Sequence, residues 1–467
     1  MKKLFLTLTI AGCLCAAASA QQYRTAYFMD EAVMRSYMNP AFHPSKGYIN
    51  IPVIGDLSLN FNSNALALNN VLYPLGSNGG LVTMLDRRVA WPDIEPVLKN
   101  QNKLGVDVHT GLLGAGFYVG DNNFFTVELG LDMVVGANVP KGLVEFVKLG
   151  SQSTAYDLHG LSVGTEVLAN LALGYSRPIN DNLVIGGRLN LKFGLARANV
   201  QYDRLNVALS GDRWSIDALG NMAASVVGGI GATYDENGDL DEFVFGTGGG
   251  LAGFGASIDV GAEYLLFDRI KLSAAILNVG FMSWSSKTSL TAVAETAYEF
   301  TGAQYGFNSE TQQWEYQTEG NDFDFDGLMR FRPENSKVRS KVYPGFVLGG
   351  EYDIFGDNLL GAGLLFSHRR NQYFGRTEVA LSATVNPIDW FTASLSYTVG
   401  NYKSVGDNFF NSFGLALNFH PGWIHFFIGT DFMMFRVTPQ ALPVGQKVFN
   451  LTFGLAKTIG KRHDKWL

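Results

Sequence analysis

The chain has 467 residues, of which 47% are hydrophobic and 16% charged, and its formal net charge at pH 7 is −7. An acidic balance without a basic patch argues against nucleic acid as a partner. Both cysteines, Cys13 and Cys15, lie near the N-terminus, which excludes a small secreted domain stapled by disulfides.

The first segment has the features of a secretory signal peptide. Residues 1–20 start with Lys2 and Lys3, continue as an apolar stretch and end in small residues at Ala20. We therefore expect export and cleavage after Ala20. Two other interpretations remain open, a buried first strand or helix and a lipidation box that ends at Cys13.

Residues 21–50, the next segment, lack sustained alternation and precede the first predicted strand. In a membrane barrel, a segment of this length in front of the first strand can fold back into the lumen. We expect it to act as a hatch, with the wall of the barrel formed from residues 51–467.

Alternating hydrophobicity then predicts strands along the rest of the chain. We expect fourteen, near 51–62, 104–119, 124–136, 161–177, 182–198, 252–266, 270–284, 341–353, 358–370, 376–385, 390–401, 408–419, 423–434 and 447–459. Pro344 falls inside one of them, and because proline cannot donate to a ladder, that strand is expected to begin after it. After residue 20 no stretch reaches the roughly 18 apolar residues of a spanning helix.

Short, turn-rich connections alternate with mostly longer ones between these strands. An even strand number with this alternation is typical of outer-membrane barrels, in which the short turns are periplasmic. The fold class that we expect is all-β: a transmembrane antiparallel barrel of about 14 strands, with an N-terminal hatch and long outer loops. A soluble all-β protein stays open as the alternative.

The two faces of the strands differ in a way that suits a wet lumen. In the hairpin at 377–400, Leu381 and Leu395 alternate with Ser382 and Ser396, so the apolar face is predicted to contact lipid. The polar faces carry charges expected to line the lumen: Glu128, Asp132, Glu166, Arg188, Lys192, Glu351 and Glu378, with Asp259 and Glu263 beside them.

Aromatic residues near the strand ends predict two belts at the membrane interfaces. By the short turns these are Trp390, Phe419, Trp423, Phe355 and Tyr175; toward the long loops they are Phe281, Trp284, Tyr402, Phe432 and Phe435. The β-propensity of aromatic residues explains the same positions without a membrane.

The long connections contain two stretches of interest. "PKGLVEFVKLG" in 137–160 predicts a helix from Pro140 to Gly150. Its apolar side, Leu143, Val144, Phe146 and Val147, would either contact a lipid-like ligand or pack over the mouth of the barrel. "NMAASVVGGIGA" in 199–251 is apolar and is expected to be flexible, with the same two interpretations.

An acidic stretch within 199–251 has oxygen ligands at alternate positions. These are Asp235, Asn237, Asp239 and Asp241. Such spacing can hold Ca²⁺, but a solvated acidic turn is preferred because the twelfth-position Glu of an EF-hand is missing. A second stretch, residues 321–327, is similar and weaker.

The hatch segment carries a family resemblance. "YMNPAF", with Asn39, Pro40 and Ala41, resembles the NPA signature in the hatch of FadL-type long-chain fatty-acid transporters, and "ILNVGFMSW" at 276–284 resembles a strand-ending Asn-x-Gly pattern of that superfamily. The resemblance implies a fourteen-stranded outer-membrane barrel, in which Asn39–Ala41 gates the lumen and a kink in the third strand, 124–136, opens a lateral exit. Phe42-His43-Pro44 departs from the small-residue turn usual after the motif, which suggests a divergent group.

These features lead to two functional hypotheses and no enzyme. The first is an outer-membrane channel for passive uptake of a hydrophobic or amphipathic small molecule, with membrane lipid around it and no cofactor. The second, which the resemblance to FadL-like barrels implies, is a non-transporting partner of a secretion or envelope-assembly machine, such as a type IX accessory. The G-x-G-x-x-G at Gly248–Gly253 and the G-x-S-x-G at Gly160–Gly164 both lead into strands, so neither predicts a nucleotide site or a catalytic serine.

Overall fold

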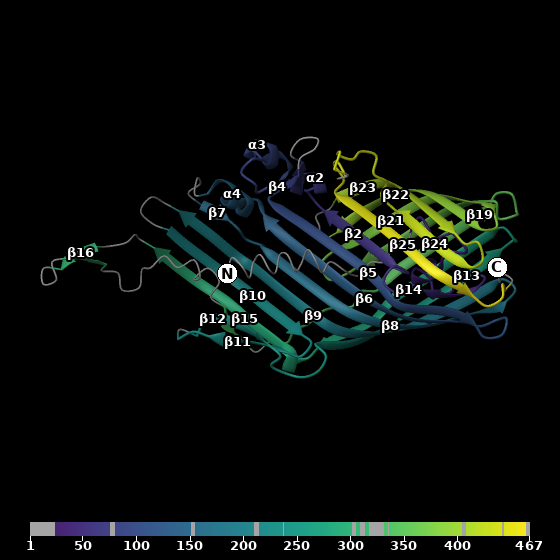
Figure 1. Cartoon of the computed structure of the whole chain (residues 1–467), viewed down its shortest axis with the longest axis horizontal. Helices are drawn as coiled ribbons and strands as arrows, with labels where there is room; N and C mark the ends of the chain where they lie inside the picture. Colours follow the sequence, from purple (N-terminus) through teal and green to yellow (C-terminus); the bar gives the residue numbers. More distant parts are fainter. Residues whose placement is uncertain are drawn as a thin grey trace.

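The wall of the molecule is a closed antiparallel β-barrel (Figure 1). The computed structural model describes residues 24–74, 80–150, 155–209, 214–236, 238–300, 305–308, 313–316, 331–334, 336–403, 408–440 and 443–463. The predicted signal peptide, Asn237 and the acidic stretch 321–327 lie outside these residues. Within them, fourteen strands form the wall, the first interrupted by a bend at 51–56, and the first and last strands pair to close it.

The wall strands follow chain order around the barrel. They are β1 (Gly47–Asn50) with β2 (Leu57–Ser63), β5 (Gln101–Tyr118), β6 (Phe124–Pro140), β8 (Ser162–Asn180), β9 (Leu183–Leu209), β13 (Gly253–Leu266), β14 (Ile270–Trp284), β19 (Gly345–Asp353), β20 (Leu360–Arg370), β21 (Gly375–Ile388), β22 (Phe391–Lys403), β23 (Asn408–Phe419), β24 (Ile424–Thr430) and β25 (Val448–Ile459). The number of strands and their order agree with the prediction. Residues 47–50, predicted as hatch, already belong to the wall.

The apolar face of each strand points outward. Leu381 is 60% exposed and its neighbour Ser382 is 5% exposed, and Leu395 and Ser396 alternate in the same way. Exposed leucine, isoleucine, valine and phenylalanine side chains recur on the other wall strands. An apolar outer surface around a polar lumen is the pattern of a barrel in lipid.

The aromatic belts are only partly as predicted. Trp390, Trp423 and Phe355 are exposed by the short turns, and Phe281 and Phe435 are exposed toward the long loops. Trp284 and Phe432 are instead buried, so their prediction as belt residues is wrong. Trp284 donates its indole N–H to Ser340 at 2.8 Å, and the Phe432 ring lies under the guanidinium of Arg24.

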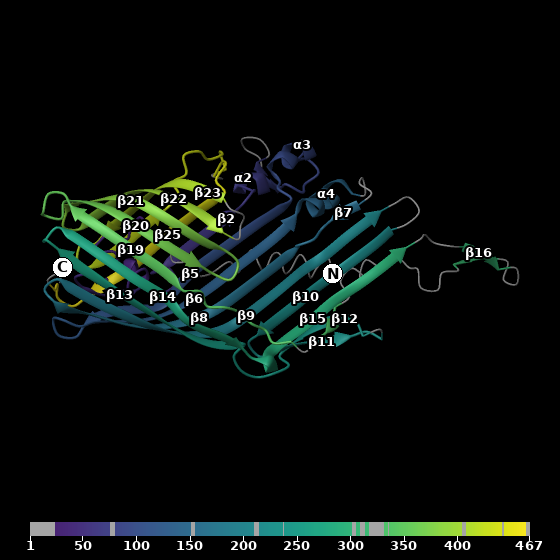
Figure 2. The same cartoon turned by 180° about the vertical axis from the view of Figure 1, so that it is seen from behind.

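One wall strand, β9, leads into a sheet that extends past one end of the barrel, opposite the C-terminus (Figures 1 and 2). The second half of β9 leaves β13 and pairs with β10 (Trp214–Val226), which pairs with β15 (Ser289–Phe300). "NMAASVV" is therefore part of a strand rather than a flexible loop. A buried cluster that includes Tyr202, Ile216 and Phe331 packs on this extension.

The remaining elements are short, and most of them lie at the long-loop end. They are α2 (Leu68–Val71), β3 (Leu72–Pro74), β4 (Leu81–Thr83), α3 (Trp91–Ile94), η2 (Glu95–Val97), α4 (Lys141–Leu149), β7 (Ala155–Asp157), β11 (Ile230–Tyr234), β12 (Leu240–Phe245), η3 (Ser286–Thr288), β16 (Tyr305–Asn308), β17 (Gln313–Tyr316) and β18 (Arg332–Pro333). None of the helices in the described residues is long and apolar enough to cross a membrane.

Residues 24–46, with the single 3₁₀ turn η1 (Val33–Tyr37), lie inside the barrel. Their apolar side chains form one buried cluster with inward-facing residues of β14, β19, β20, β21, β23 and β24, among them Leu277, Val347 and Leu365. We call residues 24–46 the hatch from here on.

Candidate functional site

The NPA motif of the hatch sits against two paired glycines of the wall. Gly186 on β9 and Gly261 on β13 are direct partners in the ladder. A Cβ on Gly261 would overlap Oδ1 of Asn39, and one on Gly186 would overlap the carbonyl oxygen of Pro40. Because neither glycine has a side chain, the NPA motif can approach the backbone of the wall closely.

Asn39 uses both ends of its amide in this position. Its Nδ2 donates to the carbonyl of Ala262 at 3.0 Å, and its Oδ1 accepts the backbone N–H of Ala41 at 3.0 Å. Asn39 therefore ties the hatch to β13 and shapes the turn after Pro40. A gating role for Asn39–Ala41 stays a prediction.

Buried ion pairs fix the hatch at two levels. Near the long-loop end, Arg24 lies 2.5 Å from Glu378 and 3.4 Å from Asp431, all of them almost fully buried. Toward the short turns, Asp30 accepts from Arg35 at 2.6 Å and from Lys271 at 3.0 Å. Removing one member of a buried pair leaves an uncompensated charge and costs about 3–5 kcal/mol. The ion pairs thus hold the hatch strongly in place.

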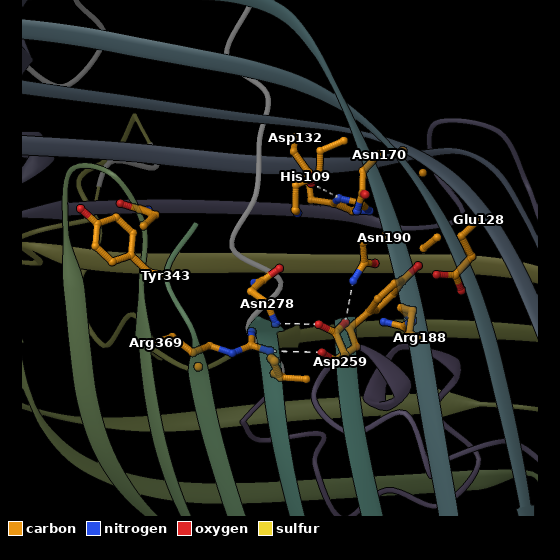
Figure 3. A pocket seen from close by; sticks show the side chains of 18 of the residues that line it. His109, Glu128, Asp132, Asn170, Arg188, Asn190, Asp259, Asn278, Tyr343 and Arg369 are labelled. Carbon is orange, nitrogen blue, oxygen red and sulfur yellow. Dashed lines mark hydrogen bonds and ion pairs between the residues drawn. The ribbon is translucent and has the colours of Figure 1, made fainter. Parts of the chain in front are cut away.

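A polar cavity of about 150 Å³ lies between the hatch and the wall (Figure 3). Its lining includes Tyr37 of the hatch and side chains from β5, β6, β8, β9, β13 and β14, together with Tyr343 and residues 369–371. An engineered cavity of that volume holds benzene, so there is room for the head group of a lipid-like molecule but not for a long chain.

The charge that lines the cavity is positive, although the whole chain is acidic. Five Arg and Lys side chains face three carboxylates, with His109 in addition. The carboxylates have partners: Asp132 accepts from His109 at 2.8 Å, Glu128 from the Tyr48 hydroxyl at 3.0 Å, and Asp259 from Asn190 at 3.0 Å.

Lys192 differs from these groups. Its side chain is only 8% exposed, it lines the cavity, and it makes no hydrogen bond or ion pair with another described residue. Its partner across the ladder, Asn170, also lines the cavity, and the Oδ1 of that amide has no hydrogen-bond partner among the described residues. Lys192 thus lines the cavity without a counter-charge among the described residues, and a cation in that position favours an anionic ligand.

His109 connects three elements at the edge of the cavity. Its Nδ1 is 2.8 Å from Asp132 on β6, and its Nε2 is 3.1 Å from Asp56, in the bend before β2. Carboxylates thus lie near both ring nitrogens, and Nδ1 is the one that is hydrogen-bonded. The Cβ position of Gly130 is occupied by this ring. The site was missed because the sequence separates its three members.

All seven predicted lumen charges face inward, but most are occupied by internal contacts. Arg188 donates to the carbonyl of Ser36 at 3.1 Å, Glu166 pairs with Arg197 at 2.7 Å, and Glu378 pairs with Arg24. Glu351 lines a second, smaller cavity with Asp30 and Lys271. Glu128, Asp132 and Lys192 line the larger cavity.

The predicted helix over 141–149 is present as α4, with Pro140 and Gly150 as its caps. Val144 is buried against Val89 and Ile94, and Leu143 and Phe146 pack on the cluster of the outer extension. Val147 is 56% exposed. Three of the four side chains proposed for ligand contact are therefore committed to packing over the outer end of the barrel.

The acidic stretch forms the turn between β11 and β12. Oδ1 of Asp235 accepts the N–H of Asp239 at 2.8 Å, and Asp239 pairs with Arg332 at 3.2 Å, while Asp241 is exposed. Within the described residues, no three His, Cys, Asp or Glu side chains come together as a metal site. Calcium binding stays a prediction.

The third strand, β6, has no break. It pairs with β8 without interruption from Phe124 to Asn138, and its ladder with β5 has one bulge, near Gly111 on the β5 side. The lateral exit that the resemblance implied in this strand is not observed. The Asn-x-Gly pattern at Asn278 likewise lies within β14 and not at its end.

A family model described as a family of unknown function (DUF5723) matches residues 40–431. A search of curated proteins found no match. Similar solved structures include the Pseudomonas putida toluene transporter TodX, with a TM-score of 0.43 and 8% identity over 93% of this chain and 95% of that one. A Pseudomonas aeruginosa FadL homologue has a TM-score of 0.42 and 10% identity over 92% and 94% of the two chains.

The Ralstonia pickettii toluene transporter TbuX has a TM-score of 0.38 and 10% identity over 92% of this chain and 95% of that one. With identities of 8–10% and TM-scores below 0.5, these structures establish nothing about the ligand of this chain.

Proposed function

The chain belongs to the family of unknown function (DUF5723), so its activity must be argued from its own geometry, and we propose that it is an outer-membrane channel. Its ligand is an amphipathic small molecule with an anionic head group, taken up passively. The head group binds in the lumen cavity, and the outer membrane is the location that fits a closed barrel with an apolar outside.

The observation that carries this proposal is the positive lining of the cavity, to which Lys192 belongs. A carboxylate or phosphate in the cavity would give the Lys192 ammonium the counter-charge that it lacks. The cavity is too small for a hydrocarbon chain and too polar to attract one, which favours a molecule with a small acidic head.

Binding of dodecyl phosphate to the purified barrel in nonionic detergent, followed by native mass spectrometry, tests this proposal. A hydrogen bond to a charged group contributes about 1.5–3 kcal/mol. Lys192→Met is therefore expected to weaken binding by roughly 10- to 100-fold. Lys461→Met removes an exposed ammonium at the short-turn end and is the matched control. Equal affinity in both variants would contradict the proposal.

A second candidate function is the docking of an envelope protein partner, and the outer extension favours it. β9, β10 and β15 continue past the barrel as a sheet with a buried cluster of its own, which offers a rigid surface outside the membrane. Gentle crosslinking followed by affinity purification tests this role. A stable protein partner recovered in place of a bound amphiphile would favour docking over transport.

A further inference from the structure

The ladder between β14 and β19 stops halfway up the wall. Regular pairing runs from Ile270 opposite Tyr352 to Leu277 opposite Gly345. Among the described residues, the next link between the two sides is the isolated bridge of Ser283 with Arg339, next to the hydrogen bond of Trp284. Residues 278–282 and 340–344 face one another between these links without ladder pairing. We call this stretch the seam; at about 3.4 Å per residue it is roughly 17 Å long.

The sequence explains why the ladder stops at this point. Pro344 lies directly before Gly345, the last paired residue on this side, and proline has no N–H to donate to the ladder. On the other side, Asn278 has a φ of 57° in a bulge, and its N–H is donated at 2.7 Å to Asp259, which is buried in the lumen. At this height of the wall, neither strand therefore has a backbone N–H left for the ladder between β14 and β19.

The cavity reaches the seam from the inside. Leu277 and Asn278 on one side and Tyr343 and Gly345 on the other are among its lining residues. Figure 3 labels Asn278 and Tyr343. The guanidinium of Arg370 lies over the Tyr343 ring, 4.6 Å from its centroid. A cationic group thus lies beside Tyr343 at the seam.

The membrane side of the seam is apolar. Val279 and Phe281 on β14 and Phe346 on β19 are exposed on the outer surface. A polar, positively lined cavity and an apolar outer surface therefore meet at a part of the wall without ladder hydrogen bonds. This arrangement matches the two halves of an acidic amphiphile.

We propose that the seam between β14 and β19 is a lateral portal, through which an anionic head group passes between the bilayer and the cavity. The inference rests on the proposed function and adds a route to it. The hydrocarbon chain stays in lipid, so the hatch need not move and its buried ion pairs stay intact.

The test uses the full chain in lipid nanodiscs with a diazirine-bearing dodecyl phosphate as the probe, and mass spectrometry to locate the label. Cys13 and Cys15 are replaced by serine. The variant Asn278→Cys/Tyr343→Cys is then closed with a short, reducible bis-maleimide. The control, Leu364→Cys/Leu381→Cys, links exposed cross-strand partners of β20 and β21 in the same way.

The portal predicts label on cavity residues in the wild type, at least a tenfold loss after the seam is closed, and recovery when the linker is reduced. The control link leaves the labelling unchanged. Gly345→Leu is a second way to close the seam, because a Cβ there meets its nearest atoms at 3.3–3.4 Å and the longer side chain would fill the inner mouth.

The outcomes separate the portal from the proposed function. Undiminished cavity labelling in the closed seam and in Gly345→Leu would overturn the portal and leave the binding site standing. Absence of label from the cavity of the folded wild-type barrel would overturn both.

Discussion

Gly186 and Gly187 are neighbours on β9 that face opposite sides of the wall, and they allow a matched test of how the hatch is seated. A Cβ on Gly186 would overlap the Pro40 carbonyl, whereas the nearest atom to a Cβ on Gly187 is 3.7 Å away. Overpacking costs about 1–3 kcal/mol, so Gly186→Ala should lower the denaturant midpoint in detergent. Gly187→Ala should leave it nearly unchanged, and equal midpoints for the two variants would rule out this seating.

His43 makes the hatch sensitive to acid. Burial lowers the pKa of His43 from 6.5 to about 4, and the ring contacts the hydroxyl of Tyr118 at 2.8 Å. Between pH 6.5 and 4 the unfolded chain therefore binds the proton more strongly than the folded one. This contribution to the free energy of unfolding is fully present above pH 6.5 and is lost as the pH falls toward 4, by about 3 kcal/mol.

Unfolding midpoints of the wild type and His43→Phe, measured from pH 7.5 to pH 4, check this expectation. Phenylalanine keeps a ring between Tyr118 and Phe124 but cannot take up a proton. The variant should lose less stability over the window than the wild type. Parallel curves for the two proteins would show that His43 does not titrate in this way.

For single residues, the sequence predicts the face of the wall that a side chain occupies but not its partners. The alternation within each strand predicted that Glu128, Arg188 and Lys192 face the lumen, because the period of two fixes the face of every side chain. The partners of these groups depend on strand neighbours and on the path of the hatch. The position of His109 between Asp56 and Asp132, and the lack of a partner at Lys192, are set by that tertiary arrangement.

At the scale of elements, most strand and helix ends could be predicted from the residue types at the turns. Turn-rich connections such as residues 386–389 located the hairpins, Pro344 predicted the start of β19, and Pro140 with Gly150 predicted α4. "NMAASVVGGIGA" was mistaken for a flexible loop because its glycines suggested one. Its first half is held as a strand by its neighbours β9 and β15, which supply the hydrogen bonds.

Helix α4 tests whether the outer cluster is a structural cap. Val144 is 3% exposed and Val147 is 56% exposed on the same short helix. Val144→Asp places a carboxylate among Val89 and Ile94, where an unpaired charge is costly, so limited proteolysis within 141–149 should become several-fold faster. Val147→Asp should be cleaved like the wild type, and identical cleavage of both variants would contradict packing by Val144.

The whole molecule combines a closed wall with a hatch inside its lumen, and the two differ in how far their sequences repeat a pattern. The wall needs only a repeated pattern and an even number of strands, so it could be predicted. The hatch has no repeat; its path follows from contacts such as Asn39 with Ala262 and Asp30 with Lys271, each between residues more than two hundred positions apart. The lack of alternation in residues 21–50 and the NPA motif indicated which segment would form the hatch, but not its path.

If the hatch closes the barrel, releasing its first ion pair should open a path for ions. Arg24 is 2% exposed and is held by Glu378 and Asp431, and its guanidinium lies over the Phe432 ring at 4.9 Å. Arg24→Met keeps the length of the side chain but removes the cation from buried Asp431 and leaves Glu378 with Arg376 alone, 3.4 Å away. Such a loss costs about 3–5 kcal/mol, enough to populate a displaced hatch while the wall stays closed by its own ladder.

Single-channel recording in planar bilayers measures this directly. Arg24→Met should show frequent openings with a larger conductance than the wild type. Arg88→Met breaks an exposed pair with Asp86, which contributes at most about 1 kcal/mol, and should behave as the wild type does. Silent Arg24→Met channels in a folded barrel would mean that the lumen stays closed without this pair, and closure would then rest on Asn39 and on the ion pairs of Asp30.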